Sequence, residues 1–366
     1  MGSLKLRGLD DFSPKELELF WKDYQPGVSS AKILGVSISC SNRCNLKCIY
    51  CYAGNERKRE GELDLNEQKQ ILSQAAELGA KTVVICGDGE PSIDPNLPQI
   101  VMHAKTLGLS TIVVSNGVIF GDDNQCQKVH NMPGLDFLKL LYENNASLII
   151  KLESINQDRY EEIVGVSGTF EKFMRGIDRM VECGYGNLNN TEVGAVTRFA
   201  FSSVIMKNNI EELPTLKSFA DSRNAQFICK LPSLVGSALK NIDNMFEVSE
   251  YEVIRKQLFD YTAKRETLMV DTPRCMAWHY GPCIDIKGEI RECYTSAYTP
   301  DKRVGNIRET SLKELIEKKN TSCDLLCNDF CPVKSRINKE FEKKGMKKIW
   351  NQKEDGVNVC EKILGF

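Results

Sequence analysis

Four cysteines lie within twelve residues near the start of the chain: Cys40, Cys44, Cys48 and Cys51. The last three follow the spacing C-x3-C-x2-C. Thiolates are the usual protein ligands of iron–sulfur clusters. Three thiolates around a cube of four irons leave one iron without a protein ligand, and that iron can bind and reduce a small molecule. The spacing therefore predicts a [4Fe–4S] cluster on Cys44, Cys48 and Cys51, with Cys40 as a buried neighbour.

The elements that must position this loop alternate along the chain. Six β-rich segments are expected as strands: 33–39, 82–86, 110–115, 147–151, 198–206 and 226–230. Segments of helical period lie between them, at 66–78, 97–107, 135–143, 169–183 and 213–222. Such alternation predicts an α/β fold of parallel strands joined by right-handed crossovers. A mixed segment, residues 1–30, precedes the first strand and is expected to form a short helix against the body.

Composition excludes several classes of partner. The net charge is −2, from 48 basic and 50 acidic residues, so no global field attracts nucleic acid or an anionic membrane. The start lacks a signal peptide, and no stretch reaches the ~18 apolar residues of a membrane span. A cytoplasmic location is expected. Eleven of the fifteen cysteines fall in two groups, which in a reducing compartment indicates metal binding or chemistry rather than disulfides.

The text around the cluster motif, SCSNRCNLKCIYCY at residues 39–52, resembles the signature of the radical S-adenosylmethionine (radical SAM) superfamily, including the aromatic Tyr50 before the third cysteine. The resemblance implies a partial (β/α)6 TIM-like barrel over residues 31–236, with its site at the carboxyl ends of the strands. It implies that S-adenosylmethionine binds the open iron and is cleaved by one electron, supplied by a flavodoxin or ferredoxin. The resulting 5′-deoxyadenosyl radical would take a hydrogen atom from the substrate.

The second expected strand ends in CGDGEP, residues 86–91. Glycines there allow backbone to approach a ligand, and a carboxylate accepts hydrogen bonds from an ammonium group. On its own the stretch is equally typical of a tight turn. Its place after the cysteine loop resembles the family's G-G-E-P motif, which holds the methionine amino group. Gly87, Asp88, Gly89 and Glu90 are therefore predicted cofactor contacts, although Asp88 departs from the family pattern.

Polar residues follow the other expected strands. Each is by itself as typical of a solvated turn or a helix cap, and their order along the chain supports a shared site. The predicted cofactor contacts here, besides Tyr50, are Ser115, Asn116, Glu153, Ser203 and Leu234.

A second cysteine group lies in residues 237–366. Cys275, Gly288 and Cys293 resemble the opening of the SPASM/twitch extension of radical SAM enzymes, and residues 284–290 are expected as a β-hairpin with a Lys-Gly turn. The resemblance implies one or two auxiliary [4Fe–4S] clusters, and the assigned ligands are Cys275, Cys283, Cys293 and Cys331 for the first and Cys323, Cys327 and Cys360 for the second. The sequence departs from the family's later spacing. A structural zinc site is the alternative, but seven cysteines exceed the four of one tetrahedral site.

Cys229 ends the sixth expected strand and is the candidate catalytic residue. A thiol facing the pocket can return a hydrogen atom to a substrate radical, as an epimerisation requires. The alternative is a buried, inert core thiol.

The resulting prediction is an oxidoreductase or epimerase acting on a small molecule, such as a sugar, aminocyclitol or amino-acid derivative. Only about 30 residues precede the first strand, whereas peptide-modifying relatives commonly carry an added N-terminal recognition domain of ~80 residues or more, which is near the lower limit for an independent domain. A peptide-modifying maturase or epimerase is the alternative. A non-catalytic iron–sulfur electron carrier is a distant third, because a carrier needs neither the GDGE stretch nor a six-stranded barrel.

Overall fold

The computed structural model describes residues 4–13, 15–16, 18, 31–54, 60–233, 236–247, 250–262, 281–291 and 304–321. The strands are β1 (Lys5–Leu6), β2 (Gly35–Ile38), β3 (Thr82–Ile85), β4 (Ser110–Ser115), β5 (Ala146–Lys151), β6 (Asn189–Thr191), β7 (Gly194–Thr197), β8 (Phe199–Val204), β9 (Gln226–Lys230), β10 (Cys283–Ile284), β11 (Glu289–Arg291) and β12 (Gly305–Asn306). The helices are α2 (Leu65–Glu77), α3 (Leu97–Thr106), α4 (Asp123–His130), α5 (Gly134–Glu143), α6 (Gln157–Val164), α7 (Phe170–Glu182), α8 (Leu213–Asp221), α9 (Ser237–Lys240), α10 (Tyr251–Tyr261) and α12 (Leu312–Thr321).

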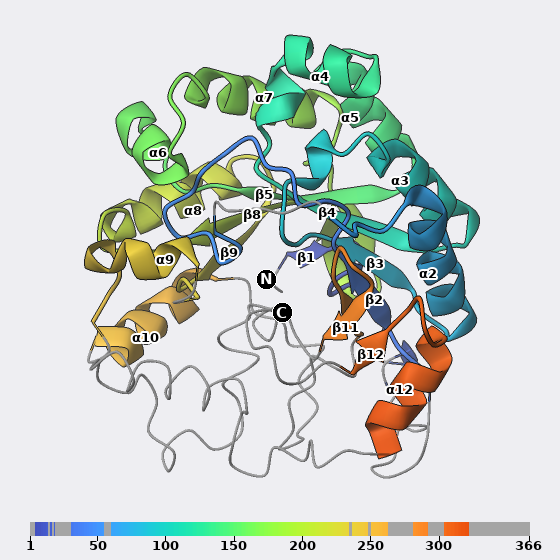
Figure 1. Cartoon of the computed structure of the whole chain (residues 1–366). Helices are drawn as coiled ribbons and strands as arrows, with labels where there is room; N and C mark the ends of the chain where they lie inside the picture. Colours follow the sequence, from blue (N-terminus) through green and yellow to red (C-terminus); the bar gives the residue numbers. More distant parts are fainter. Residues whose placement is uncertain are drawn as a thin grey trace.

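Nine strands form the main sheet, in the order β12-β11-β10-β2-β3-β4-β5-β8-β9. The six strands from β2 to β9 in this order are parallel, and the helices lie along the outer side of the curved sheet (Figure 1). No pairing within the described residues joins β9 to β12, so the sheet is open. The α/β class and the mostly parallel sheet are as the sequence predicts.

The two faces of the sheet carry alternate residues of each strand. Residues such as Val36, Val83 and Phe227 pack against the helices in the main core. The opposite side, called the inner face below, carries a second apolar cluster, which includes Val84 and Ile228. The central strands are therefore buried on both sides, as parallel strands usually are.

The N-terminal segment fills the inner face at the amino ends of the strands. Leu6 and Leu9 are buried in the inner cluster, and β1 pairs in parallel with β7. Thr82 donates its hydroxyl proton to the Gly8 carbonyl at 2.7 Å. Residues 4–13 form a short strand and a turn whose apolar side chains are buried, and the described residues that follow within the expected segment, 15, 16 and 18, are helical. Residues 4–13 are called the N-terminal plug below. Because they fill the amino end of the inner face, a site on that face must lie at the carboxyl ends of the strands.

The described C-terminal residues extend the same sheet. Strands β10 and β11 form the predicted hairpin, with Cys283 opposite Arg291, and β10 runs parallel to β2. The sheet therefore does not end at residue 236, where the sequence predicts a domain boundary. None of the described helices is long and apolar enough to cross a membrane.

Candidate active site

The cysteine loop, residues 40–54 and called the cluster loop below, is held by its backbone. Lys47 and Ile49 donate their amide protons to carbonyls at the end of α6, at 2.9 and 3.0 Å. Ser237, at the start of α9, donates to the Cys51 carbonyl at 2.8 Å, and Glu90 donates to the Arg43 carbonyl at 2.6 Å. Three separate parts of the sheet's carboxyl edge thus fix the loop.

Glycines make these approaches possible. A Cβ on Gly89 would lie 2.3 Å from the Arg43 carbonyl oxygen, and one on Gly236 would lie 2.3 Å from that of Tyr52. Gly87 has a φ of 125°, and a Cβ there would fall 1.9 Å from the Ser39 hydroxyl oxygen. Only glycine allows backbone to pack so closely against the loop.

The three motif thiols are half-buried in this loop. Burial raises the pKa of Cys48, and the neighbouring thiols of Cys44 and Cys51 raise it further. The three thiols therefore lie within electrostatic reach of one another, as ligands of one cluster must. In the described residues no three Cys, His, Asp or Glu side chains converge on a single ion. A cube does not require such convergence, because each thiolate binds a different iron.

The Glu90 carboxylate is buried and joins the turns after β3 and β4. Its Oε1 accepts from the amide and hydroxyl of Ser92 at 2.9 and 2.6 Å, and its Oε2 accepts from the Asn116 amide at 2.7 Å. Burial raises its pKa, and these donors oppose the rise. Each carboxylate oxygen can accept more than one hydrogen bond, so Glu90 can still meet a ligand's ammonium group.

The predicted contacts Ser115 and Asn116 also brace this edge. The Ser115 hydroxyl accepts from the Gly117 amide at 3.0 Å, and the Asn116 side chain donates to Asn45 Oδ1 at 2.8 Å. Asn45 in turn donates to Gln125 at 3.3 Å. Asn45 was not among the predicted contacts, although its place inside the motif is a signal that could have identified it.

Glu153 lies directly beneath the cluster loop and is fully buried. The Tyr50 hydroxyl donates to Glu153 Oε1, and the Val204 amide donates to Oε2 at 2.8 Å. Lys151 Nζ lies 3.4 Å from Glu153 Oε1 and 5.4 Å from the centre of the Tyr50 ring. The structure therefore brings together the predicted residues Tyr50 and Glu153.

Lys151 is a site residue that sequence reasoning missed. It has the same strand parity as Ile149, which lies in the inner cluster, so it points to the inner face at the carboxyl end of β5. Its side chain is 19% exposed. A partly solvated cation there is suited to hold a carboxylate. The alternation of inward and outward side chains along β5 is the signal that could have identified Lys151.

Two predicted residues lie on the wrong face for contact with a ligand. Ser203 shares the helix-facing side with Phe201, is fully buried, and donates to the Leu152 carbonyl. Cys229 packs in the same core, and its thiol donates to the Leu258 carbonyl in α10 at 3.3 Å. Burial raises the Cys229 pKa to about 12. The predicted placement of Cys229 as a pocket-facing hydrogen donor is wrong, because Ile228 takes the inner position.

Of the predicted auxiliary ligands, only Cys283 lies in the described residues. Its neighbour Ile284 packs in the helix-facing core, so Cys283 points to the inner face, and it is buried. The remaining predicted positions lie outside the described residues: Leu234, Cys275, Cys293, Cys323, Cys327, Cys331 and Cys360.

The departure from the family pattern at Asp88 has a partner in the C-terminal hairpin. Arg291 in β11 binds Asp285 at 2.5 Å. Burial lowers the pKa of Arg291, but the carboxylates of Asp285 and Asp88 outweigh it and the net shift is upward. The Asp88 carboxylate is thus one of the charges that raise the pKa of Arg291, after that of Asp285.

Residues 38–197 match the sequence profile of the Radical SAM superfamily. The chain contains a radical SAM domain. It is 26% identical over 244 residues to Fe-coproporphyrin III synthase of Methanosarcina barkeri, covering 66% of this chain and 53% of that protein. It is 25% identical over 305 residues to PqqA peptide cyclase of Xanthomonas oryzae pv. oryzae, covering 77% of this chain and 73% of the cyclase. The chain thus spans about half the length of the synthase, as it does of a probable GTP 3′,8-cyclase from Methanococcus maripaludis, at 47%.

Solved structures share the fold of the radical SAM domain. SuiB of Streptococcus suis bound to S-adenosylmethionine superposes with a TM-score of 0.61 at 16% identity, covering 84% of this chain and 75% of SuiB. The family uses a [4Fe–4S] cluster and S-adenosylmethionine, and the donors found here fit both. The three grouped thiols suit the cluster. The inner-face cation Lys151 and the acceptor Glu90 suit the carboxylate and amino groups of the methionine moiety of S-adenosylmethionine. When bound, these groups supply reductive cleavage of the sulfonium bond.

Replacing Tyr50 by Phe should lower the free energy of unfolding by about 1 to 2 kcal/mol, because the buried Glu153 loses a donor. The matched control is Tyr160→Phe. Tyr160 is more deeply buried than Tyr50, and within the described part of the chain its hydroxyl has no hydrogen-bond partner, so its removal should be neutral or stabilising. Urea unfolding of the two cluster-free variants measures the difference. Equal stabilities would contradict the role given to the Tyr50 hydroxyl.

Proposed function

We propose that this radical SAM enzyme modifies a peptide. The observation that carries the proposal is the length of the similarity to PqqA peptide cyclase, which covers 77% of this chain and 73% of the cyclase. It extends well beyond the matched domain at residues 38–197, whereas the similarity to the coproporphyrin synthase covers 53% of that enzyme. Residues outside the radical SAM domain commonly decide substrate choice, because the radical chemistry itself belongs to the cofactor.

Fold neighbours support the same substrate class. SuiB has also been solved with its precursor peptide SuiA, with a TM-score of 0.60 to this chain. The protein anSMEcpe, solved with AdoMet and the Cp18Cys peptide, has a TM-score of 0.51. The sequence-based preference for a small molecule rested on the short segment before the first strand. The comparisons favour the peptide alternative over it.

In the proposed mechanism the chain holds and shields the reacting groups. Cys44, Cys48 and Cys51 hold the cluster in the cluster loop, and Lys151 and Glu90 orient the methionine moiety of S-adenosylmethionine at the inner face. The N-terminal plug fills the amino end of that face and so shields the site from water on that side. A flavodoxin or ferredoxin supplies the electron.

We assign Cys283, with cysteines outside the described residues, to an auxiliary cluster of a SPASM/twitch-type extension. Its side chain faces the same inner side as Lys151, and β2, β3 and β4 separate its strand β10 from β5 in the sheet. That placement suits a group that accepts an electron from a substrate radical. The proposed reaction is therefore an oxidation or cross-link of the peptide, and it needs no thiol donor.

The substrate class is tested by following hydrogen. Peptides encoded by short reading frames beside the gene are synthesised with deuterium at all non-exchangeable carbons and incubated anaerobically with the reduced enzyme and S-adenosylmethionine. We expect one deuterium to appear in 5′-deoxyadenosine and the peptide to lose that deuterium. GTP and the free amino acids, deuterated in the same way, are the controls. Transfer from one of these controls with none from any peptide would make the proposal wrong.

A further inference from the structure

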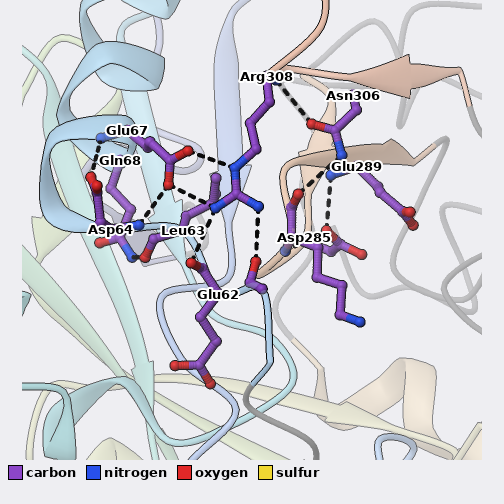
Figure 2. Close-up of polar contacts among 11 residues, drawn as sticks. Glu62, Leu63, Asp64, Glu67, Gln68, Asp285, Glu289, Asn306 and Arg308 are labelled. Atoms are coloured by element: carbon purple, nitrogen blue, oxygen red, sulfur yellow. Dashed lines mark hydrogen bonds and ion pairs between the residues drawn. The ribbon is translucent and has the colours of Figure 1, made fainter.

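Arg308, in the C-terminal part of the chain, binds residues 61–67, which lead from the cluster loop into α2. Arg308, directly after β12 and Ile307, reaches across to the start of α2 (Figure 2). Its Nε and Nη2 bind the two oxygens of Glu67 at 2.5 and 2.8 Å. Its Nη1 and Nη2 also donate to the carbonyls of Gly61 and Glu62, at 3.0 and 3.1 Å.

Other hydrogen bonds orient both partners of the contact between Arg308 and Glu67. Glu67 is the N3 residue of a capping box with Asp64, and its Oε2 accepts from the Asp64 amide at 2.8 Å, so the helix end itself orients the carboxylate that Arg308 binds. The Arg308 amide is itself held by Asn306 Oδ1 at 2.9 Å, and the Asn306 amide group donates to the Lys287 carbonyl in the hairpin at 3.0 Å. The guanidinium is thereby placed by the hairpin and β12.

Two further hydrogen bonds link the segment that Arg308 binds to the cluster loop. The Glu62 side chain accepts from the Asn42 amide at 3.0 Å, two residues before Cys44. Gln68, the next residue after Glu67, donates to the Cys40 carbonyl at 3.1 Å and is buried. Both contacts fall on the first three residues of the loop.

A simple exposed ion pair would contribute little, since such pairs are typically worth ~0–1 kcal/mol. Arg308 differs because it forms a two-pronged contact with a carboxylate and adds two backbone carbonyls, which only the planar guanidinium can satisfy together. The side chains of Arg308 and Glu67 are 38% and 28% exposed, so the contact is partly screened. We therefore attribute to this contact little stability of its own, and its effect is to fix the position of the segment before α2.

We propose that Arg308 is a positioning residue for the radical cluster: it ties the C-terminal extension to residues 40–42 and so sets where the cluster loop begins. The extension that contains Cys283 thereby holds the loop that contains Cys44. The inference concerns the loop alone, and it stands whether the substrate is a peptide or a small molecule.

The test is amide hydrogen exchange on the anaerobically purified full chain, with its iron and after chelation. Arg308→Gln should speed exchange at the Asn42 amide at least about tenfold, because opening the Glu62 contact becomes easier. Arg308→Lys keeps the charge but loses the fork, and should give an intermediate rate. Iron loss to a chelator should accelerate in the same order.

Two controls separate positioning from general loosening. Lys313→Gln removes a cation from α12 of the same extension, where Lys313 meets only the exposed side of its own helix near Glu317. Ile177→Val truncates the buried core of α7. Neither should change exchange at Asn42. The proposal is overturned if Asn42 exchanges at the wild-type rate in Arg308→Gln, or if Ile177→Val accelerates it equally. The Lys variant keeps the test decisive should Arg308→Gln fold poorly.

Discussion

The variant with Ala at Cys44, Cys48 and Cys51 should lose about four irons per chain and all cleavage of S-adenosylmethionine. The three thiols share one loop, and the charges of Cys44 and Cys51 raise the pKa of Cys48, so we expect the three to act as one ligand set. Iron analysis and detection of 5′-deoxyadenosine measure the two losses. Cys183→Ala, at a half-buried thiol at the end of α7, is the matched control and should keep both. Cleavage retained by the triple variant would contradict the assignment.

The iron that stays in the triple variant reports on the C-terminal cysteines. About four or eight remaining irons, with matching sulfide, indicate one or two auxiliary clusters. Zinc in place of iron would favour the structural zinc alternative. Cys283 is buried in β10, which pairs with β2 of the main sheet, so a metal bound to it would be anchored to the sheet that carries the cluster loop.

The strands were predictable where alternation and turn residues agree. The expected segments 110–115 and 226–230 coincide with β4 and β9. Helix α4 was missed because only Cys126 and His130 of its eight residues are buried, so it lacks an apolar period. The N-terminal plug was also beyond local reasoning: Gln226 donates to the Leu4 carbonyl across a sequence separation of 222 residues.

For the site, the sequence predicts the order of the polar strand ends but not which way their side chains face. In β9 the run Phe227, Ile228 and Cys229 is buried on both sides, because the N-terminal plug covers the inner face. A strand with two apolar faces has no polar alternation to reveal its phase. Ser203 and Cys229 were misplaced for this reason.

Long-range charge pairing was equally hidden from the sequence. In the sequence Asp88 is only a departure from the family motif, and Arg291, whose pKa its charge raises, lies some two hundred residues later. The larger contribution to Arg291 comes from Asp285, whose carboxylate binds it directly. A local motif alone cannot show such distant pairing.

Replacing Gly89 by Ala should reduce the rate of S-adenosylmethionine cleavage about 100-fold while the protein remains folded. A Cβ there would lie 2.3 Å from the Arg43 carbonyl oxygen and 2.4 Å from that of Ser41, and both atoms belong to the backbone of the cluster loop. Backbone atoms cannot rotate away as a side chain can, so the loop itself must move. A shift of about 1 Å in a reacting site costs rate on this scale. Single-turnover kinetics on iron-loaded protein measures it.

The control for this variant is Gly108→Ala, in which the added methyl group strains the backbone but meets no neighbouring atom. Gly108 has a φ of 75° and open space around its Cα, so Ala there is strained in its backbone but contacts nothing. It should lower the free energy of unfolding by about 1 kcal/mol and leave cleavage unchanged. If Gly89→Ala instead cleaves the cofactor at the wild-type rate, the loop can move freely at Arg43. The close packing of the turn after β3 would then play no part in positioning the cluster.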